Sequence, residues 1–171
     1  MKPAARPSRE LGFTLIELLI TLAIVGLVAM VSLPLYEVTS TRLKEAELRQ
    51  ALRTIRSGLD AYKAATDSGV LPKAAGESGY PPSLEVLTQV LEIANKREFG
   101  LNASEASQRI VILRALPRDP FFPDPQVPAA QTWHTRAYAS RANDPQPGVD
   151  VFDVSSTSTR SGLDGTAYSS W

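Results

Sequence analysis

Glu17 is the residue whose chemistry fits its surroundings least well. It is the only side chain in residues 13–36 that is charged at neutral pH, in a stretch of 24 largely apolar residues. With a rise of about 1.5 Å per residue, a helix of this length reaches roughly 36 Å, enough to cross a bilayer. A carboxylate at the centre of a lipid-exposed helix costs about 3 kcal/mol or more, so such groups generally face a protein partner. Glu17 is therefore a candidate contact residue, and the alternative is a plain anchor that tolerates one carboxylate near the interface.

The residues around Glu17 form a specific pattern. Residues 11–20 have the sequence Leu-Gly-Phe-Thr-Leu-Ile-Glu-Leu-Leu-Ile and follow a short basic leader. This pattern resembles the processing site of type IV pilins and of the pseudopilins of type II secretion systems. The resemblance implies that a membrane prepilin peptidase cuts after Gly12 and that the new amino terminus, Phe13, is N-methylated.

Cleavage after Gly12 would give Glu17 an electrostatic partner. The new α-amino group of Phe13 is cationic near neutral pH and lies four residues before Glu17. Breaking such a pair in a low dielectric leaves an uncompensated charge, which costs several kcal/mol. Glu17 could fold back on its own terminus or bind the amino group of a neighbouring subunit, and the resemblance implies the second. Glu17 would then set the subunit register in a filament.

Other common chemistries find little support in the composition. The chain has no cysteine, which excludes a disulfide framework and any cysteine-ligated metal. Its formal net charge is zero, so nothing argues for a nucleic-acid partner. His134 is the only histidine and has no nearby cysteine or carboxylate cluster in the sequence. We expect no active site and no enzymatic activity.

Asp164 is a weak candidate for a calcium ligand. Resemblance to the major pseudopilins implies one calcium ion near the carboxyl end, held by aspartate side chains and backbone carbonyls. Asp164, in Gly-Leu-Asp-Gly, matches the first part of that loop, but residues 166–171 supply no second acid. Alternation along a strand would put Asp150 and Asp153 on opposite faces. We therefore expect Asp164 to be a turn residue and commit to no metal site, with calcium as the alternative.

Composition divides the chain into four segments. Residues 1–12 form a leader, residues 13–36 a transmembrane and filament-core helix, residues 37–66 an amphipathic continuation of that helix, and residues 67–171 a globular domain. Basic charge beside an apolar helix predicts a cytoplasmic amino terminus, which places the globular domain in the periplasm. Pro34 should kink or loosen the helix, because proline removes a backbone hydrogen bond.

Periodicity predicts one helix from residue 13 to about residue 65. An apolar stripe recurs at helical steps through its second half, and we expect it to pack on the chain's own sheet. The stripe comprises Leu48, Leu52, Ile55, Leu59 and Tyr62.

Shorter elements are expected after the helix. Residues 69–82 contain three glycines and three prolines and should form a loop, followed by a short helix capped by Ser83. Residues 110–116 could be a strand or the end of a helix, and residues 117–125 should form an extended loop held by Phe121 and Phe122.

The carboxyl-terminal part has a strand-like pattern. Alternation in residues 133–140 and 149–155 predicts an antiparallel hairpin. One face of the second strand would carry Val149, Val151, Asp153 and Ser155, and the other Asp150, Phe152 and Val154. A long amino-terminal helix packed on a small antiparallel sheet is an α+β, pilin-like architecture.

The interpretation that follows is a major-type pseudopilin of a type II secretion system, anchored by a single span in a bacterial inner membrane. The partners implied are further copies of the chain in a filament, minor pseudopilins, the prepilin peptidase and an inner-membrane assembly platform. Two alternatives remain open: a type IV pilin of a surface fibre for adhesion, motility or DNA uptake, and a membrane-anchored periplasmic binding domain that never polymerises.

Overall fold

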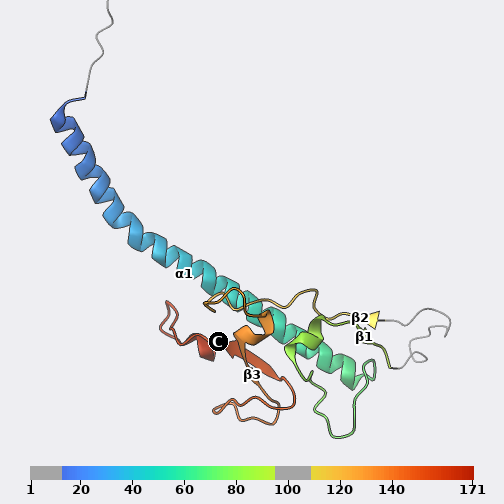
Figure 1. Ribbon diagram of the computed structural model, residues 1–171. Coiled ribbons are helices and arrows are strands. Elements are labelled where there is room, and N and C mark those ends of the chain that lie inside the picture. The colour runs from blue at the N-terminus through green and yellow to red at the C-terminus, as the bar shows by residue number, and fades with distance from the viewer. Residues whose placement is uncertain (1–12, 95–108) are drawn as a thin grey trace, which may run out of the picture. The chain divides into compact units, whose positions relative to one another are not determined.

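The computed structural model describes residues 13–94 and 109–171 (Figure 1). The chain forms two compact units, Met1–Thr41 and Arg42–Trp171. Helix α1 (Leu15–Asp67) contributes to both units. The predicted long helix is thus confirmed, within two residues at each end. With small antiparallel sheets in the second unit, the fold is α+β, as the sequence predicted.

The remaining elements are short and all belong to the second unit. The 3₁₀ helices are η1 (Leu84–Thr88), η2 (Ala129–Thr132) and η3 (Tyr168–Ser170). The strands are β1 (Leu91–Glu92), β2 (Arg109–Ile110), β3 (Trp133–Arg136) and β4 (Asp153–Ser156). They form two antiparallel pairs, β1 with β2 and β3 with β4.

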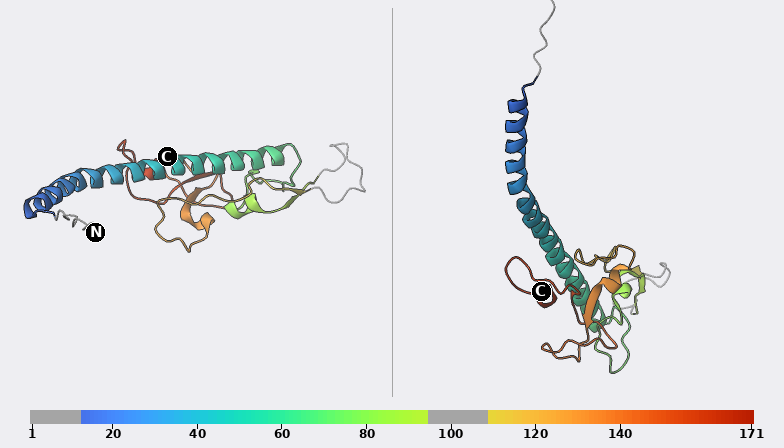
Figure 2. Two further views of the ribbon diagram at one scale, coloured as in Figure 1. Left: turned by 90° about the horizontal axis from the view of Figure 1, so that it is seen from above. Right: turned by 60° about the vertical axis from the view of Figure 1, so that its left-hand side comes forward.

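The core of the second unit lies along one face of α1. Four of the five predicted stripe residues are almost completely buried, and Tyr62 packs at the edge. The side chains that cover the stripe come from η1, β3, β4 and η3, and both views in Figure 2 show these elements beside residues 42–67. Members of this core are Leu48, Ala51, Leu52, Ile55, Leu59, Leu84, Leu87, Trp133, Val151, Val154 and Tyr168. The prediction that the stripe packs within the chain is confirmed.

The β3–β4 pair confirms the predicted hairpin but corrects its length and faces. Trp133 pairs with Ser156, and Arg136 pairs with Asp153. The Phe152 N–H still donates to the Arg136 carbonyl (2.8 Å), but the Val151 N–H donates to the Pro81 carbonyl instead (2.8 Å). Val151 and Val154 are both buried, although alternation along one strand would place them on opposite faces.

Two further expectations needed correction. The short helix expected after Ser83 is the 3₁₀ helix η1, which ends at Thr88, and Leu91 lies beyond it in β1. Ser83 precedes the helix in extended conformation but makes no side-chain capping bond. In residues 110–116, which could have been strand or helix, only Ile110 belongs to a regular element, strand β2.

The proline-rich loop is held to the core as predicted for Phe121. The Phe121 ring stacks on Tyr168 with centroids 4.2 Å apart. Buried Asp119 fixes the loop from inside, since its carboxylate accepts hydrogen bonds from the Phe121 N–H (2.8 Å) and from the Ser156 hydroxyl. The Trp133 indole N–H donates to the Pro117 carbonyl (3.0 Å).

Candidate processing and assembly segment

Thr14 starts α1 and positions Glu17 in its first turn. The Glu17 N–H donates to the Thr14 side-chain oxygen (3.3 Å), and the Leu18 N–H donates to the Thr14 carbonyl (3.1 Å). Thr14 is therefore the N-cap, and Thr-x-x-Glu is the sequence of a capping box. A carboxylate in the first turn also interacts favourably with the positive end of the helix dipole. Sequence reasoning missed this local role of Glu17, although the Thr14 to Glu17 spacing signals it.

Apolar side chains cover the whole circumference of α1 in the first unit. Every large apolar side chain in residues 15–35 is between 53% and 77% exposed in the isolated chain. One 18-residue stretch of α1 has a mean hydropathy of 2.6, and α1 is the single helix in the described ranges long and apolar enough to cross a membrane, judged by length and composition alone. A helix that is apolar on all sides needs a cover of lipid or of other helices. The segment therefore fits a membrane anchor.

Hydroxyl side chains within this helix are satisfied by its own backbone. Thr21 donates to the Leu18 carbonyl (2.9 Å) and Ser32 donates to the Val28 carbonyl (2.8 Å). Such internal bonds let polar residues lie in an apolar environment without an exposed donor. They leave Glu17 as the one side chain in residues 13–36 whose charge needs an external partner.

The structure places the predicted site residues as follows. Phe13 and Glu17 are exposed at the start of α1, and Pro34 is exposed within the helix, which continues through it. Gly12 lies outside the described residues. Helix α1 thus begins at Leu15, three residues after Gly12, and carries a carboxylate in its first turn.

Comparison with known protein families bears on this segment directly. Residues 7–33 match the prokaryotic N-terminal methylation motif. The match includes Gly12, Phe13 and Glu17, and it supports the type IV pilin and pseudopilin family broadly. The motif indicates a pilin-like or pseudopilin-like subunit and implies processing by prepilin peptidase and filament assembly. Comparisons with curated proteins and with solved structures each gave no match.

A second cluster of charged residues joins α1 to the carboxyl-terminal loop. Glu45 is only 5% exposed, and its Oε1 accepts hydrogen bonds from the Leu163 N–H (2.7 Å) and from the Tyr168 hydroxyl (3.1 Å). Burial, and then the Glu45 hydrogen bond, raise the pKa of Tyr168. Sequence reasoning missed Glu45, which stands three residues before Leu48 and so extends the buried stripe by one helical step.

Arg49 lies between two carboxylates of this cluster. Its Nη2 is 3.8 Å from Glu45 Oε2 and 4.0 Å from Asp164 Oδ2. The guanidinium carbon lies 4.0 Å from the centroid of the Trp171 ring, a cation–π arrangement. Asp164 itself lies in a turn, where its Oδ1 accepts bonds from the Thr166 N–H (2.9 Å) and hydroxyl (2.7 Å). These bonds, followed by the charge of Arg49, lower the pKa of Asp164.

The two other aspartates considered for calcium bind protein groups at separate places. Asp150 accepts bonds from the Ser78 hydroxyl and from the Tyr138 N–H (2.9 Å). Asp153 pairs with Arg56 (2.8 Å). Across residues 13–94 and 109–171, no group of three or more histidine, cysteine, aspartate or glutamate side chains could hold a metal ion. The donors around Asp164 therefore do not fit the calcium loop that the resemblance implied.

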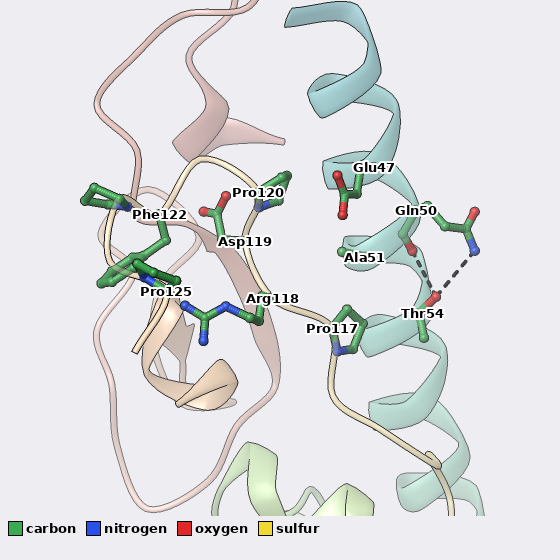
Figure 3. Close-up of a pocket in the computed structure, with 11 residues that line it drawn as sticks. Glu47, Gln50, Ala51, Thr54, Pro117, Arg118, Asp119, Pro120, Phe122 and Pro125 are labelled. Carbon is green, nitrogen blue, oxygen red and sulfur yellow. Dashed lines mark hydrogen bonds between the residues drawn. The ribbon is translucent and has the colours of Figure 1, made fainter. Parts of the chain in front are cut away.

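A hollow of about 710 Å³ separates α1 from the proline-rich loop (Figure 3). Its α1 wall carries Glu47, Gln50, Ala51 and Thr54, and its loop wall is mainly proline with Phe122. Arg118, at the loop wall, donates to the carbonyls of Asp124 (2.8 Å) and Val127. This guanidinium thus binds the main chain of the loop itself, and the accessible lining of the hollow is mostly apolar.

Proposed function

We propose that this chain is a structural subunit of a type II secretion pseudopilus. It is cut between Gly12 and Phe13, methylated on Phe13, and polymerised through its amino-terminal helix to drive protein export. The observation that carries the proposal is the combination of a methylation motif with a helix that is apolar and exposed on all sides. The chain acts as a substrate of the prepilin peptidase and has no catalytic function of its own.

Assembly follows from what the exposed helix needs. Removed from the bilayer, the side chains of residues 15–35 would face water, and contact with helices of other copies replaces the lipid. At about 25 cal/mol per Å² of apolar surface, burying a single leucine side chain contributes about 2 kcal/mol. A helix–helix core between subunits is therefore the main driving force for polymerisation.

Charge pairing would supply the register that apolar packing lacks. The Glu17 carboxylate pairs with the methylated amino group of Phe13 on a neighbouring subunit. An unpaired carboxylate in this core costs several kcal/mol, so a register that leaves Glu17 unpaired is disfavoured. Thr14 holds Glu17 in the first helical turn and thus fixes where that charge is presented.

The proposed location is the bacterial inner membrane, crossed once. The basic leader keeps the amino terminus in the cytoplasm, and residues 67–171 fold in the periplasm. Removal of the leader takes away Lys2, Arg6, Arg9 and Glu10, which together carry a net charge of +2. Because the full chain has a formal net charge of zero, the processed chain carries about −2. The expected partners are other copies, minor pseudopilins, the peptidase and an inner-membrane assembly platform.

Gene replacement in the native host tests this function. A strain lacking the gene receives the wild type, Glu17→Leu or Glu37→Leu, where Glu37 is an exposed carboxylate of the same helix beyond the apolar segment. We expect the wild type and Glu37→Leu to restore the export of proteins to the medium, whereas Glu17→Leu is made and cleaved but fails to restore it.

Other outcomes would favour the two alternatives. Loss of long surface fibres in the deletion strain, with export unchanged, would identify a type IV pilin for adhesion, motility or DNA uptake. A protein that stays monomeric at high membrane density, whatever residue stands at position 17, would identify a membrane-anchored binding domain. Cross-linking in membranes and electron microscopy of the cell surface distinguish these cases.

A further inference from the structure

We propose that the guanidinium of Arg49 is the resident cation of the carboxyl-terminal loop, residues 160–171, and that it closes this loop onto α1 without a metal ion. The loop and residues 42–67 of α1 belong to the same compact unit. The closure is a property of the folded domain, and it holds whether the filament is a pseudopilus or a pilus.

The first step is the burial of Glu45. A carboxylate removed from water needs hydrogen-bond donors or a cation, because an uncompensated buried charge costs several kcal/mol. Two donors come from the loop, the Leu163 N–H and the Tyr168 hydroxyl, and both bind Oε1. The second oxygen, Oε2, faces Arg49 one helical turn later.

The second step is the position of Arg49. Its side chain stands between Glu45 on α1 and Asp164 in the loop, at 3.8 Å and 4.0 Å. A positive charge between two carboxylates attracts both and offsets their mutual repulsion, which is the sign of effect that a bound cation would have. The indole of Trp171 covers the guanidinium from the loop side, which adds a cation–π contact.

The third step is the network that keeps the loop in this shape. The Trp171 indole N–H donates to the Thr166 hydroxyl (2.6 Å), and Thr166 in turn donates to Asp164. Arg56, two helical turns after Arg49 on α1, donates to the main-chain oxygen of Trp171 (2.7 Å). These contacts between the loop and α1 are all made by protein groups.

Calcium would compete poorly at this place. Ca²⁺ takes six to eight oxygen ligands, mainly carboxylates and carbonyls. Oδ1 of Asp164 already accepts two bonds from Thr166, its Oδ2 faces Arg49, and Oε1 of Glu45 accepts two bonds from the loop. A divalent ion here would also lie beside a guanidinium, and like charges at this separation repel.

Hydrogen exchange of the full-length protein in detergent micelles tests the proposal. The reporter is the Leu163 amide, which is bound by Glu45. In the wild type we expect its exchange to be the same in excess calcium and in excess EGTA. In Arg49→Met, which keeps the apolar stem but removes the charge, we expect this amide to exchange about tenfold faster in both conditions.

A matched control separates loop opening from general damage. Arg53→Met removes a guanidinium from the same helix, one that donates to the Gln50 side-chain oxygen (2.8 Å). This variant should leave the exchange rate of the Leu163 amide unchanged. The amides of Leu52 and Ile55 should stay protected in Arg49→Met, which shows that the domain remains folded.

Two results would overturn the proposal. One is protection of the wild-type loop by calcium, removed by Asp164→Asn, since that would establish a metal site. The other is unchanged Leu163 exchange in Arg49→Met, which would show that the guanidinium does not hold the loop. If Arg49→Met failed to fold, Arg49→Lys would take its place, and we expect it to keep the closure only in part, because lysine cannot stack as a planar group on Trp171.

Discussion

The Glu17 carboxylate has one local role within the chain and one proposed role in a filament. Within one chain it lies in the capped first turn of α1, where the helix dipole favours a negative charge. In a filament it would pair with the amino group of Phe13 on a neighbour. Capping stabilises the start of a helix by about 1 kcal/mol, whereas an unpaired charge in an apolar core costs several. The charge pairing should therefore dominate the phenotype of substitutions.

Glu17→Gln separates these two roles. Glutamine can still serve at the third position of a capping box, so α1 should start normally. The filament should nevertheless assemble at least about tenfold less efficiently, because the neutral amide cannot compensate the amino group. Sedimentation of filaments from membranes measures the efficiency of assembly. Amino-terminal sequencing of the soluble fraction shows whether the unassembled protein has been cleaved. Wild-type assembly of Glu17→Gln would show that the residue acts only as a cap.

Gly162 marks the closest approach within the carboxyl-terminal loop. A Cβ atom there would lie 2.8 Å from the Trp171 ring, 3.0 Å from Asp164 and 3.1 Å from Glu45. Gly162→Ala should therefore push the loop away from α1 and lower the free energy of unfolding by about 1 to 3 kcal/mol. Gly165→Ala is no neutral control, because Gly165 has a positive φ of 83°. Gly26→Ala, with open space around it, is the suitable comparison in chemical unfolding of the full chain.

Tyr168 gives the loop a defined response to alkali. Burial raises its pKa above 10.0, and the hydrogen bond to Glu45 adds to this effect. The folded state thus favours the neutral phenol, so this contribution is complete below the unfolded pKa of about 10 and is lost as the pH rises through the folded pKa. Burial also raises the pKa of Tyr62 and of Tyr80. Tyr168→Phe should consequently remove part of the fall in melting temperature above about pH 10, and an unchanged alkaline profile would contradict this assignment.

The two parts of α1 should respond differently to loss of apolar volume. Ile55 is fully buried in the core of the second unit, and Ile55→Ala should lower the free energy of unfolding by about 2 to 5 kcal/mol. Leu33 is exposed, and Leu33→Ala should change that free energy by no more than about 0.5 kcal/mol. Loss of the near-ultraviolet circular dichroism signal in denaturant measures both. Leu33→Ala should nevertheless lower the yield of filaments, although it leaves the free energy of unfolding almost unchanged.

Elements with a long repeating pattern could be predicted from the sequence. The helix and its buried stripe follow from periodicity, and the β3–β4 pairing follows from two alternating segments. Strand ends could not be predicted, because Val151 takes the Pro81 carbonyl as its partner, a contact between residues 70 positions apart. The Glu45–Arg49 pair had a readable signal, since both lie one helical turn apart near the stripe, but its meaning depends on a loop more than 110 residues later.

The chain combines a folded domain with a helical segment, residues 15–35, whose apolar side chains are exposed in the isolated chain. The charge and hydropathy of the first 36 residues predicted an anchor and a processing point, and the match of residues 7–33 to the methylation motif supports both. Within residues 42–171, the partial match of Gly-Leu-Asp-Gly to the pseudopilin loop does not decide which filament the subunit would build. Export and fibre assays on the deletion strain, rather than further sequence comparison, decide between pseudopilus and pilus.

The intact mass of the protein recovered from membranes of its native host tests the central claim most directly. Processing predicts a chain that lacks residues 1–12 and carries one additional methyl group on Phe13. Gly12→Val should retain the full leader, while Gly26→Ala, a change elsewhere in the same segment, should be processed normally. A wild-type protein that still begins at Met1 and carries no methyl group would contradict the claim.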